Sequence, residues 1–103
     1  MVKIIKVTRE MAMSRLADVP EDKRFWYADG RTLKNLAELE IALTKMSDET
    51  FCYHSNEMKS DFSNWVRDVI GDEKLKRDLK RSANRLEAAK SVAERIAWLK
   101  SKL

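Results

Sequence analysis

Cysteine, glycine and proline are scarce in this chain of 103 residues, which has one Cys, two Gly and one Pro. A single Cys cannot form an internal disulfide, which favours a reducing, cytoplasmic compartment. So few Gly and Pro residues argue against a turn-rich all-β fold. Apolar runs are only a few residues long, far short of the roughly 20 that a membrane span needs. The opening MVKIIKVTRE has a charge inside its apolar run and no small-residue cleavage site, unlike a signal peptide.

Charge, by contrast, is abundant and unevenly distributed. Charged residues make up 37% of the chain and hydrophobic residues 44%, enough for one core without a disulfide or metal staple. A chain of this length is expected to form one domain, 1–103. Residues 71–103 carry ten Lys/Arg and five Asp/Glu, a net +5, whereas residues 1–70 carry 11 basic and 12 acidic residues, a net −1. The basic excess therefore lies in the last third.

Local patterns predict a mainly α fold, a compact bundle of four or five helices with a small β element near the N-terminus. The β-branched segment KIIKV (3–7) predicts a short strand. Asp29-Gly30 predicts a hairpin over 24–34, because both turn positions need positive φ. Gly71 is a predicted helix stop. Helices are expected to begin at or just after Thr8, Asn35, Ser47, Ser60, Asp72 and Asn84.

Apolar residues recur at helical intervals within these segments and predict the core. After Ser60, the set Phe62, Trp65, Val66, Val69 and Ile70 has the spacing of one buried face. The other predicted core positions are Met11, Leu16, Val19, Leu36, Leu39, Leu43, Met46, Leu75, Leu79, Leu86, Ala89, Val92, Ala93, Ile96 and Leu99. Of the remaining tryptophans, we expect Trp98 at the rim and Trp26 exposed.

The stretch FCYHSNEMKSDFSNW (51–65) holds the only Cys and the only His. Cys52 and His54 are two residues apart, so on a helix they diverge by about 200° and cannot form a thiolate–imidazole pair. One Cys and one His also fall short of a zinc site, so no catalytic, metal or cofactor site is predicted here. We expect His54 at the core edge, bonded to a backbone carbonyl or to Asp61, and Cys52 as a small buried hydrophobe. A helix from Asp48 would place Phe51, His54 or Ser55, and Met58 on one face.

The order of unusual residues resembles a known family. FWYADG, NLAELEIAL and FCYHSNEMKSDFSNWVRDVIGDEKL resemble a family of small, mainly archaeal proteins classed as a domain of unknown function, over about residues 25–80. Its pattern Y/F-H-x-N-x-x-K-x-D-F-x-x-W-x-x-x-V-x-G-D maps onto Tyr53, His54, Asn56, Lys59, Asp61, Phe62, Trp65, Val69, Gly71 and Asp72. The resemblance implies no established activity. Folding roles account for Asp61 as a cap, Phe62 and Trp65 as core and Gly71 as a stop.

Catalytic motifs are missing from the sequence. There is no Gly-rich phosphate loop, G-x-S-x-G or H-E-x-x-H, and Asp48 and Glu49 suit a helix start better than an acid–base pair. We therefore expect a non-enzymatic cytoplasmic binding module, a protein–protein adaptor or a subunit of a larger assembly. A small-ligand-binding regulatory domain or an enzyme is the least favoured class. The candidate partner-binding residues are His54, Asn56, Lys59 and Trp26.

The alternative partner is a nucleic acid or a ribonucleoprotein, bound through the basic segment EKLKRDLKRSANR (73–85). With Leu75 and Leu79 turned inward, the bases fall on the outer arc of a short helix, and the next helix start near Asn84 adds N–H groups for a phosphate. Nothing here predicts base reading, so binding would depend little on sequence. If the segment does not bind a nucleic acid, it is simply a charged helix face in contact with solvent. The candidate residues are Lys74, Lys76, Arg77, Lys80, Arg81 and Arg85.

Overall fold

The computed structural model describes residues 6–27 and 30–103 of the chain. Most of the strand predicted at 3–7, and residue Asp29 of the predicted turn, lie outside these residues. The described part contains six α-helices and a two-stranded sheet, which confirms the mainly α fold with a small β element. The elements are α1 (Arg9–Leu16), β1 (Phe25–Tyr27), β2 (Arg31–Leu33), α2 (Leu36–Lys45), α3 (Asp48–His54), α4 (Asp61–Trp65), α5 (Glu73–Arg81) and α6 (Arg85–Lys100).

The strands β1 and β2 form the hairpin predicted for 24–34. They pair antiparallel, with Phe25 opposite Leu33 and Trp26 opposite Thr32. Gly30 has a φ of 70°, the left-handed conformation that an Asp-Gly turn requires of its glycine. Phe25 and Leu33 are buried while Trp26 points to solvent, so one face of the hairpin closes the core.

Side-chain caps begin most helices, as their sequence predicts. Thr8, Asn35, Ser47, Asp72 and Asn84 each accept a hydrogen bond from the backbone N–H three residues later. This satisfies one of the N–H groups that a helix start leaves without a partner.

A π-helical turn, Val66–Ile70, continues α4. It ends at Gly71, whose φ of 84° is the left-handed conformation expected of a helix stop. Trp65 at the end of α4 is buried, and its Nε1–H donates to the Lys23 carbonyl over 2.8 Å. The core role predicted for Trp65 is confirmed.

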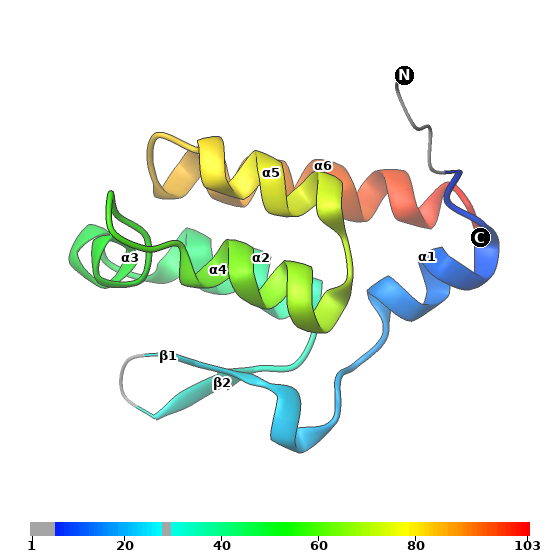
Figure 1. Cartoon of the computed structure of the whole chain (residues 1–103), viewed down its shortest axis with the longest axis horizontal. Coiled ribbons are helices and arrows are strands. Elements are labelled where there is room, and N and C mark those ends of the chain that lie inside the picture. The colour runs from blue at the N-terminus through cyan, green and yellow to red at the C-terminus, as the bar shows by residue number, and fades with distance from the viewer. Residues whose placement is uncertain (1–5, 28–29) are drawn as a thin grey trace.

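The helices form two layers against the hairpin. In Figure 1, α5 and α6 run together along the upper side, α4 and α2 lie below them, and β1 and β2 close the lower edge. Helix α2 packs along α6, and α5 contacts both α4 and α6. The buried residues of this core are Ala12, Phe25, Leu33, Leu36, Leu39, Ala42, Leu43, Met46, Phe51, Phe62, Trp65, Val66, Ile70, Leu75, Leu79, Ala88, Ala89, Val92 and Leu99.

Met11 and Ala93, predicted as core residues, are half-buried and are not part of the core cluster. The core position predicted for Leu86 is wrong. Its side chain is 59% exposed, whereas Ala88, two residues later, is buried. Two residues on an α-helix are separated by about 200°, so burying Ala88 against α2 turns Leu86 to solvent. Trp98 is 39% exposed, in agreement with its expected place at the rim.

Candidate functional site

His54 lies at the end of α3, where its ring is only 7% exposed. Its Nδ1 is 2.9 Å from Asp61 Oδ2, and Lys59 Nζ lies 3.2 Å from the same oxygen. The prediction that His54 bonds to Asp61 at the core edge is confirmed. The prediction that Asp61 caps a helix is wrong, because Asp61 is the first residue of α4 and its carboxylate is engaged by His54 and Lys59.

Aromatic rings enclose the imidazole of His54. The ring centroids of Phe25 and Phe62 lie 5.3 and 5.4 Å from that of His54. Nε2 is buried and has no hydrogen-bond partner among the described residues. The ring therefore joins α3, α4 and β1.

Asn56 closes the turn after α3. Its Nδ2 donates to the Cys52 carbonyl over 2.8 Å, and its Oδ1 accepts from the Met58 N–H over 2.8 Å. Lys59 is also engaged, since its Nζ lies 4.4 Å from the centroid of the Tyr53 ring as well as beside Asp61. The sequence grouped His54, Asn56 and Lys59 as partner-binding residues; in the structure His54 Nδ1, the Asn56 amide and Lys59 Nζ each make a contact within the molecule.

Cys52 and Met58 differ from the sequence prediction. Phe51 and His54 form the inner face of α3, so Cys52 between them is exposed rather than buried. The helix ends at His54, which leaves Met58 in the following turn and 91% exposed. Among the described residues, no group of three His, Cys, Asp or Glu side chains is placed to hold a metal ion.

Two of the six candidate phosphate-binding bases are engaged in structural contacts. Lys74 pairs with Asp78 one turn along α5. Arg85 donates from Nη1 to the Leu43 and Thr44 carbonyls over 2.8 and 2.6 Å, and from Nε to Asp48 over 3.1 Å. These carbonyls end α2, where a cation is favourable. Arg85 therefore joins α6 to the end of α2.

The other four bases, Lys76, Arg77, Lys80 and Arg81, form the free basic face of α5. Leu75 and Leu79 are buried as predicted, which turns these four side chains away from the core. Within residues 6–27 and 30–103, none of the four makes an ion pair with a carboxylate. Their charge is therefore available to a partner.

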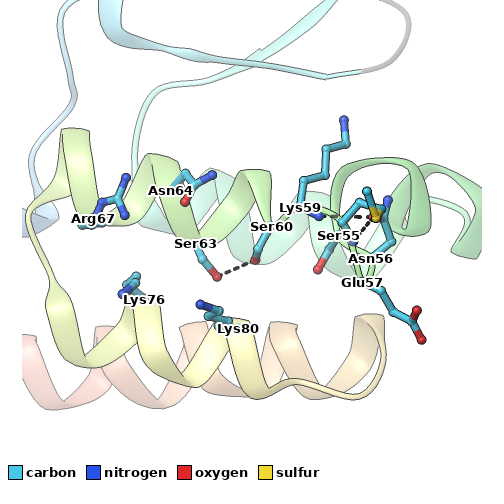
Figure 2. Close-up of a pocket in the computed structure, with 11 residues that line it drawn as sticks. Ser55, Asn56, Glu57, Lys59, Ser60, Ser63, Asn64, Arg67, Lys76 and Lys80 are labelled. Atoms are coloured by element: carbon cyan, nitrogen blue, oxygen red, sulfur yellow. Dashed lines mark hydrogen bonds between the residues drawn. The ribbon is translucent and has the colours of Figure 1, made fainter.

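A polar groove of about 530 Å³ runs between α4 and α5. Figure 2 shows Lys76 and Lys80 on the side of α5 that faces α4, with Ser63 and Ser60 opposite them. Ser60 Oγ and Ser63 Oγ are hydrogen-bonded over 2.7 Å. Lys59 belongs to the rim, and its side chain extends away from α5 (Figure 2). The other lining residues are Ser55, Asn56, Glu57, Met58, Asn64 and Arg67.

The charges that line this groove are not equally available. Arg67 donates to Asp68 from Nε over 2.8 Å and from Nη2 over 3.2 Å. This hydrogen bonding lowers the pKa of Asp68 and raises that of Arg67, so both stay charged and compensate each other. Glu57 is the acidic residue of the lining. Lys76 and Lys80 together outweigh Glu57, so the lining keeps a net positive charge.

A buried ion network that the sequence did not reveal fixes α5 in place. Asp72 Oδ1 accepts from the Leu75 N–H over 3.0 Å, which is the predicted cap. Asp72 Oδ2 also accepts from Arg95 Nε over 2.7 Å and lies 3.7 Å from Arg15 Nη1. One sequence signal could have indicated this network: Arg95 is a charged residue on the face of α6 that the apolar residues predict to be buried.

Comparison of the chain with protein families, with curated proteins and with solved structures gave no match. The resemblance of residues 25–80 to a family therefore stays a prediction. None of the helices in the described ranges has the length and apolar character needed to traverse a bilayer.

Proposed function

We propose that this protein is a non-catalytic cytoplasmic module that binds the phosphate backbone of nucleic acids through α5. The observation that carries the proposal is the free basic face, Lys76, Arg77, Lys80 and Arg81, which has no carboxylate partner among the described residues. A cluster of unpaired cations on the outward side of one helix is the electrostatic footprint of a polyanion partner.

The helix that carries these cations is held rigidly. Leu75 and Leu79 anchor it to the core, and Asp72 fixes its first turn to α6 through Arg95. The four cations are therefore presented on one rigid helix before a ligand arrives, which lowers the ordering cost of binding. Lys and Arg contacts to phosphate carry little sequence information, so affinity should depend weakly on base sequence.

The test is a fluorescence-anisotropy titration with short RNA and DNA, repeated from about 50 to 200 mM salt. Each phosphate contact contributes about −0.9 (duplex) or −0.7 (single strand) to the slope of log affinity against log salt, so four duplex contacts would give a slope near −3.6. The test variant is Lys76→Gln/Arg77→Gln/Lys80→Gln/Arg81→Gln. Gln keeps a helix propensity close to that of Lys and Arg, so loss of binding would report lost charge.

A matched control removes the same charge elsewhere. The control variant is Lys23→Gln/Lys45→Gln/Lys90→Gln/Lys100→Gln, at four exposed positions outside α5. We expect the α5 variant to lose binding and the control to retain it within about threefold, the effect of a general change in net charge. No micromolar binding by the unmodified protein at low salt, or equal losses in the two variants, would refute the proposal.

The adaptor expected from the sequence is the second candidate, and Trp26 is the observation that favours it. Trp26 is 67% exposed on the outer side of β1, and exposed Trp is enriched in the energetic centres of protein interfaces. His54, Asn56 and Lys59 support it less, because their polar groups bond within the molecule. Protection of Trp26 from oxidative footprinting in the native complex, abolished by dissociation, is the expected result for an adaptor.

A further inference from the structure

We infer that the groove between α4 and α5 selects single-stranded over duplex nucleic acid; this deepens, and rests on, the function proposed above. The four side chains of the free basic face lie in two different environments. Lys76 is half-buried and, with Lys80, lines the groove beside α4. Arg77 and Arg81 are exposed, and Arg77 lines a different hollow, with Arg15 and Trp98.

Helix geometry explains this division. Lys76 and Lys80 are four residues apart and so lie on the same side of α5 about 6 Å apart along its axis, as do Arg77 and Arg81. The second pair follows the first by one residue, which rotates it by about 100°. One pair is therefore recessed beside α4 and the other projects outward.

A recessed pair and a projecting pair favour different ligands. A duplex is stiff, with a persistence length of about 150 base pairs, so it cannot fold into a narrow groove and meets projecting side chains more readily than recessed ones. A single strand can bend into a concave groove and reach Lys76 and Lys80. The groove volume of about 530 Å³ is within the range of small-ligand sites, too small for a double helix to enter.

The lining of the groove suits an unpaired strand. The hydroxyl group of Ser55 and the amide group of Asn64 can donate to or accept from the pairing edges of bases, which a duplex keeps paired. No aromatic residue lines this groove in the part of the chain that the structure describes. Base stacking therefore adds nothing, and the contact is made by charge and hydrogen bonds.

The groove also has a continuation. A second hollow of about 400 Å³ shares Ser55, Asn56, Glu57 and Lys80 with the first, and continues past Cys52 to Ser82 and Asn84. A strand that contacts Lys76 and Lys80 can therefore leave along α3, bending around Lys80. This path provides a probe, because Cys52 is the only cysteine and is exposed.

The experiment compares two variants of equal charge on one helix, Lys76→Gln/Lys80→Gln and Arg77→Gln/Arg81→Gln. Anisotropy titrations use an unstructured single strand and a duplex of the same length, each as RNA and as DNA. We expect the single strand to bind at least about tenfold more tightly than the duplex, with a salt slope near −1.4 for two contacts. The Lys76/Lys80 variant should lose at least about tenfold in affinity for the single strand, and the Arg77/Arg81 variant less than about threefold.

A third variant separates the effect of groove shape on affinity from the effect of the surface charge. Asn64→Met fills part of the groove without changing any charge or adding an aromatic ring, and should weaken single-strand binding while leaving residual duplex binding unchanged. A fluorophore on Cys52 should respond to the single strand and not to the duplex. Circular dichroism and urea melts of each variant establish that it is folded.

The outcomes distinguish this inference from the function on which it rests. If the unmodified protein binds neither form at low salt, the proposed function fails and this inference with it. If both forms bind, but the duplex binds as tightly or the Arg77/Arg81 variant loses as much as the Lys76/Lys80 variant, nucleic-acid binding stands and groove selection is overturned. Unchanged single-strand binding by Asn64→Met would also overturn it.

Discussion

Substitution of Asp72 should destabilise the protein more than substitution of any exposed carboxylate. Asp72 is fully buried, and its two oxygens hold separate partners, the Leu75 N–H and the Arg95 guanidinium. In Asp72→Ala, Arg95 would remain in the core without a counter-charge, which typically costs about 3–5 kcal/mol. Loss of the cap adds about 1 kcal/mol. The sum, about 4–6 kcal/mol, is comparable with the whole stability of a small domain, about 5–15 kcal/mol.

Asp72→Asn separates the two contributions. The amide oxygen can still accept from the Leu75 N–H, so only the charge is lost, and we expect about 1 kcal/mol less destabilisation than in Asp72→Ala. Urea unfolding followed by tryptophan fluorescence measures both values, with an unchanged m-value as the sign that the two-state comparison holds. Asp68→Asn is the control, because Asp68 is exposed, and it should change stability by no more than about 0.5 kcal/mol.

Arg95 provides the refuting test. Because Asp72→Asn leaves a buried guanidinium unpaired, replacing that guanidinium by an apolar chain in Asp72→Asn/Arg95→Met should recover part of the lost stability. Strict additivity of the two substitutions, or an Asp72→Asn protein within about 1 kcal/mol of the unmodified one, would show that the ion network does not fix α5.

Three further predictions concern single side chains. Trp65→Ala should lower the free energy of unfolding by about 3–5 kcal/mol in urea melts, because it removes a buried aromatic side chain. Trp26→Ala, at an exposed position, should lower it by less than about 1 kcal/mol, and equal losses would contradict the burial of Trp65. Cys52 should react with a thiol reagent in the native protein at a rate that denaturant does not greatly increase, since it is exposed; slow labelling before unfolding would contradict this. Arg67→Gln should raise the pKa of Asp68 toward its usual range, as followed by NMR titration of the carboxyl carbon; an unchanged pKa would mean that the pair does not form in solution. A carboxylate with a lowered pKa contributes stability that is lost as the pH falls through that pKa; because this pair is exposed, its loss should change stability little, so the Arg67→Gln protein and the unmodified protein should have nearly the same dependence of stability on acid pH.

Features that depend on neighbouring residues could be predicted from the sequence. The hairpin, the caps at Asn35 and Asn84, and the stop at Gly71 follow from local hydrogen bonding and backbone conformation. The burial of Trp65 followed from its place in a helical repeat. These signals act over a few residues and do not depend on where other helices lie.

Features that depend on helix docking could not be predicted in the same way. The sequence could not show which basic residues of the last third lack a partner within the protein. Arg85 is not among them, because α2 ends beside it and its guanidinium donates to the last carbonyls of that helix. Leu86 was assigned to the core from a helical repeat, which gives a face but not its limits. Cys52 was expected to be buried because free cysteines usually are, and this tendency does not say on which side of a helix a residue lies. The Asp72–Arg95 pair joins residues 23 apart, beyond the reach of local patterns.

The packing of α2 on α6 has a consequence for synthesis of the chain on the ribosome. Helix α2 ends at Lys45, but the helix that covers its apolar face ends only at Lys100. At translation rates of about 5–20 residues per second, Leu36, Leu39 and Leu43 stay uncovered for on the order of 3–10 s. Through this interval the nascent chain presents a leucine-rich helix face of the kind that chaperones bind. The core can therefore close only after residues 85–100 have left the exit tunnel, and a pause in translation within α6 would prolong the exposure.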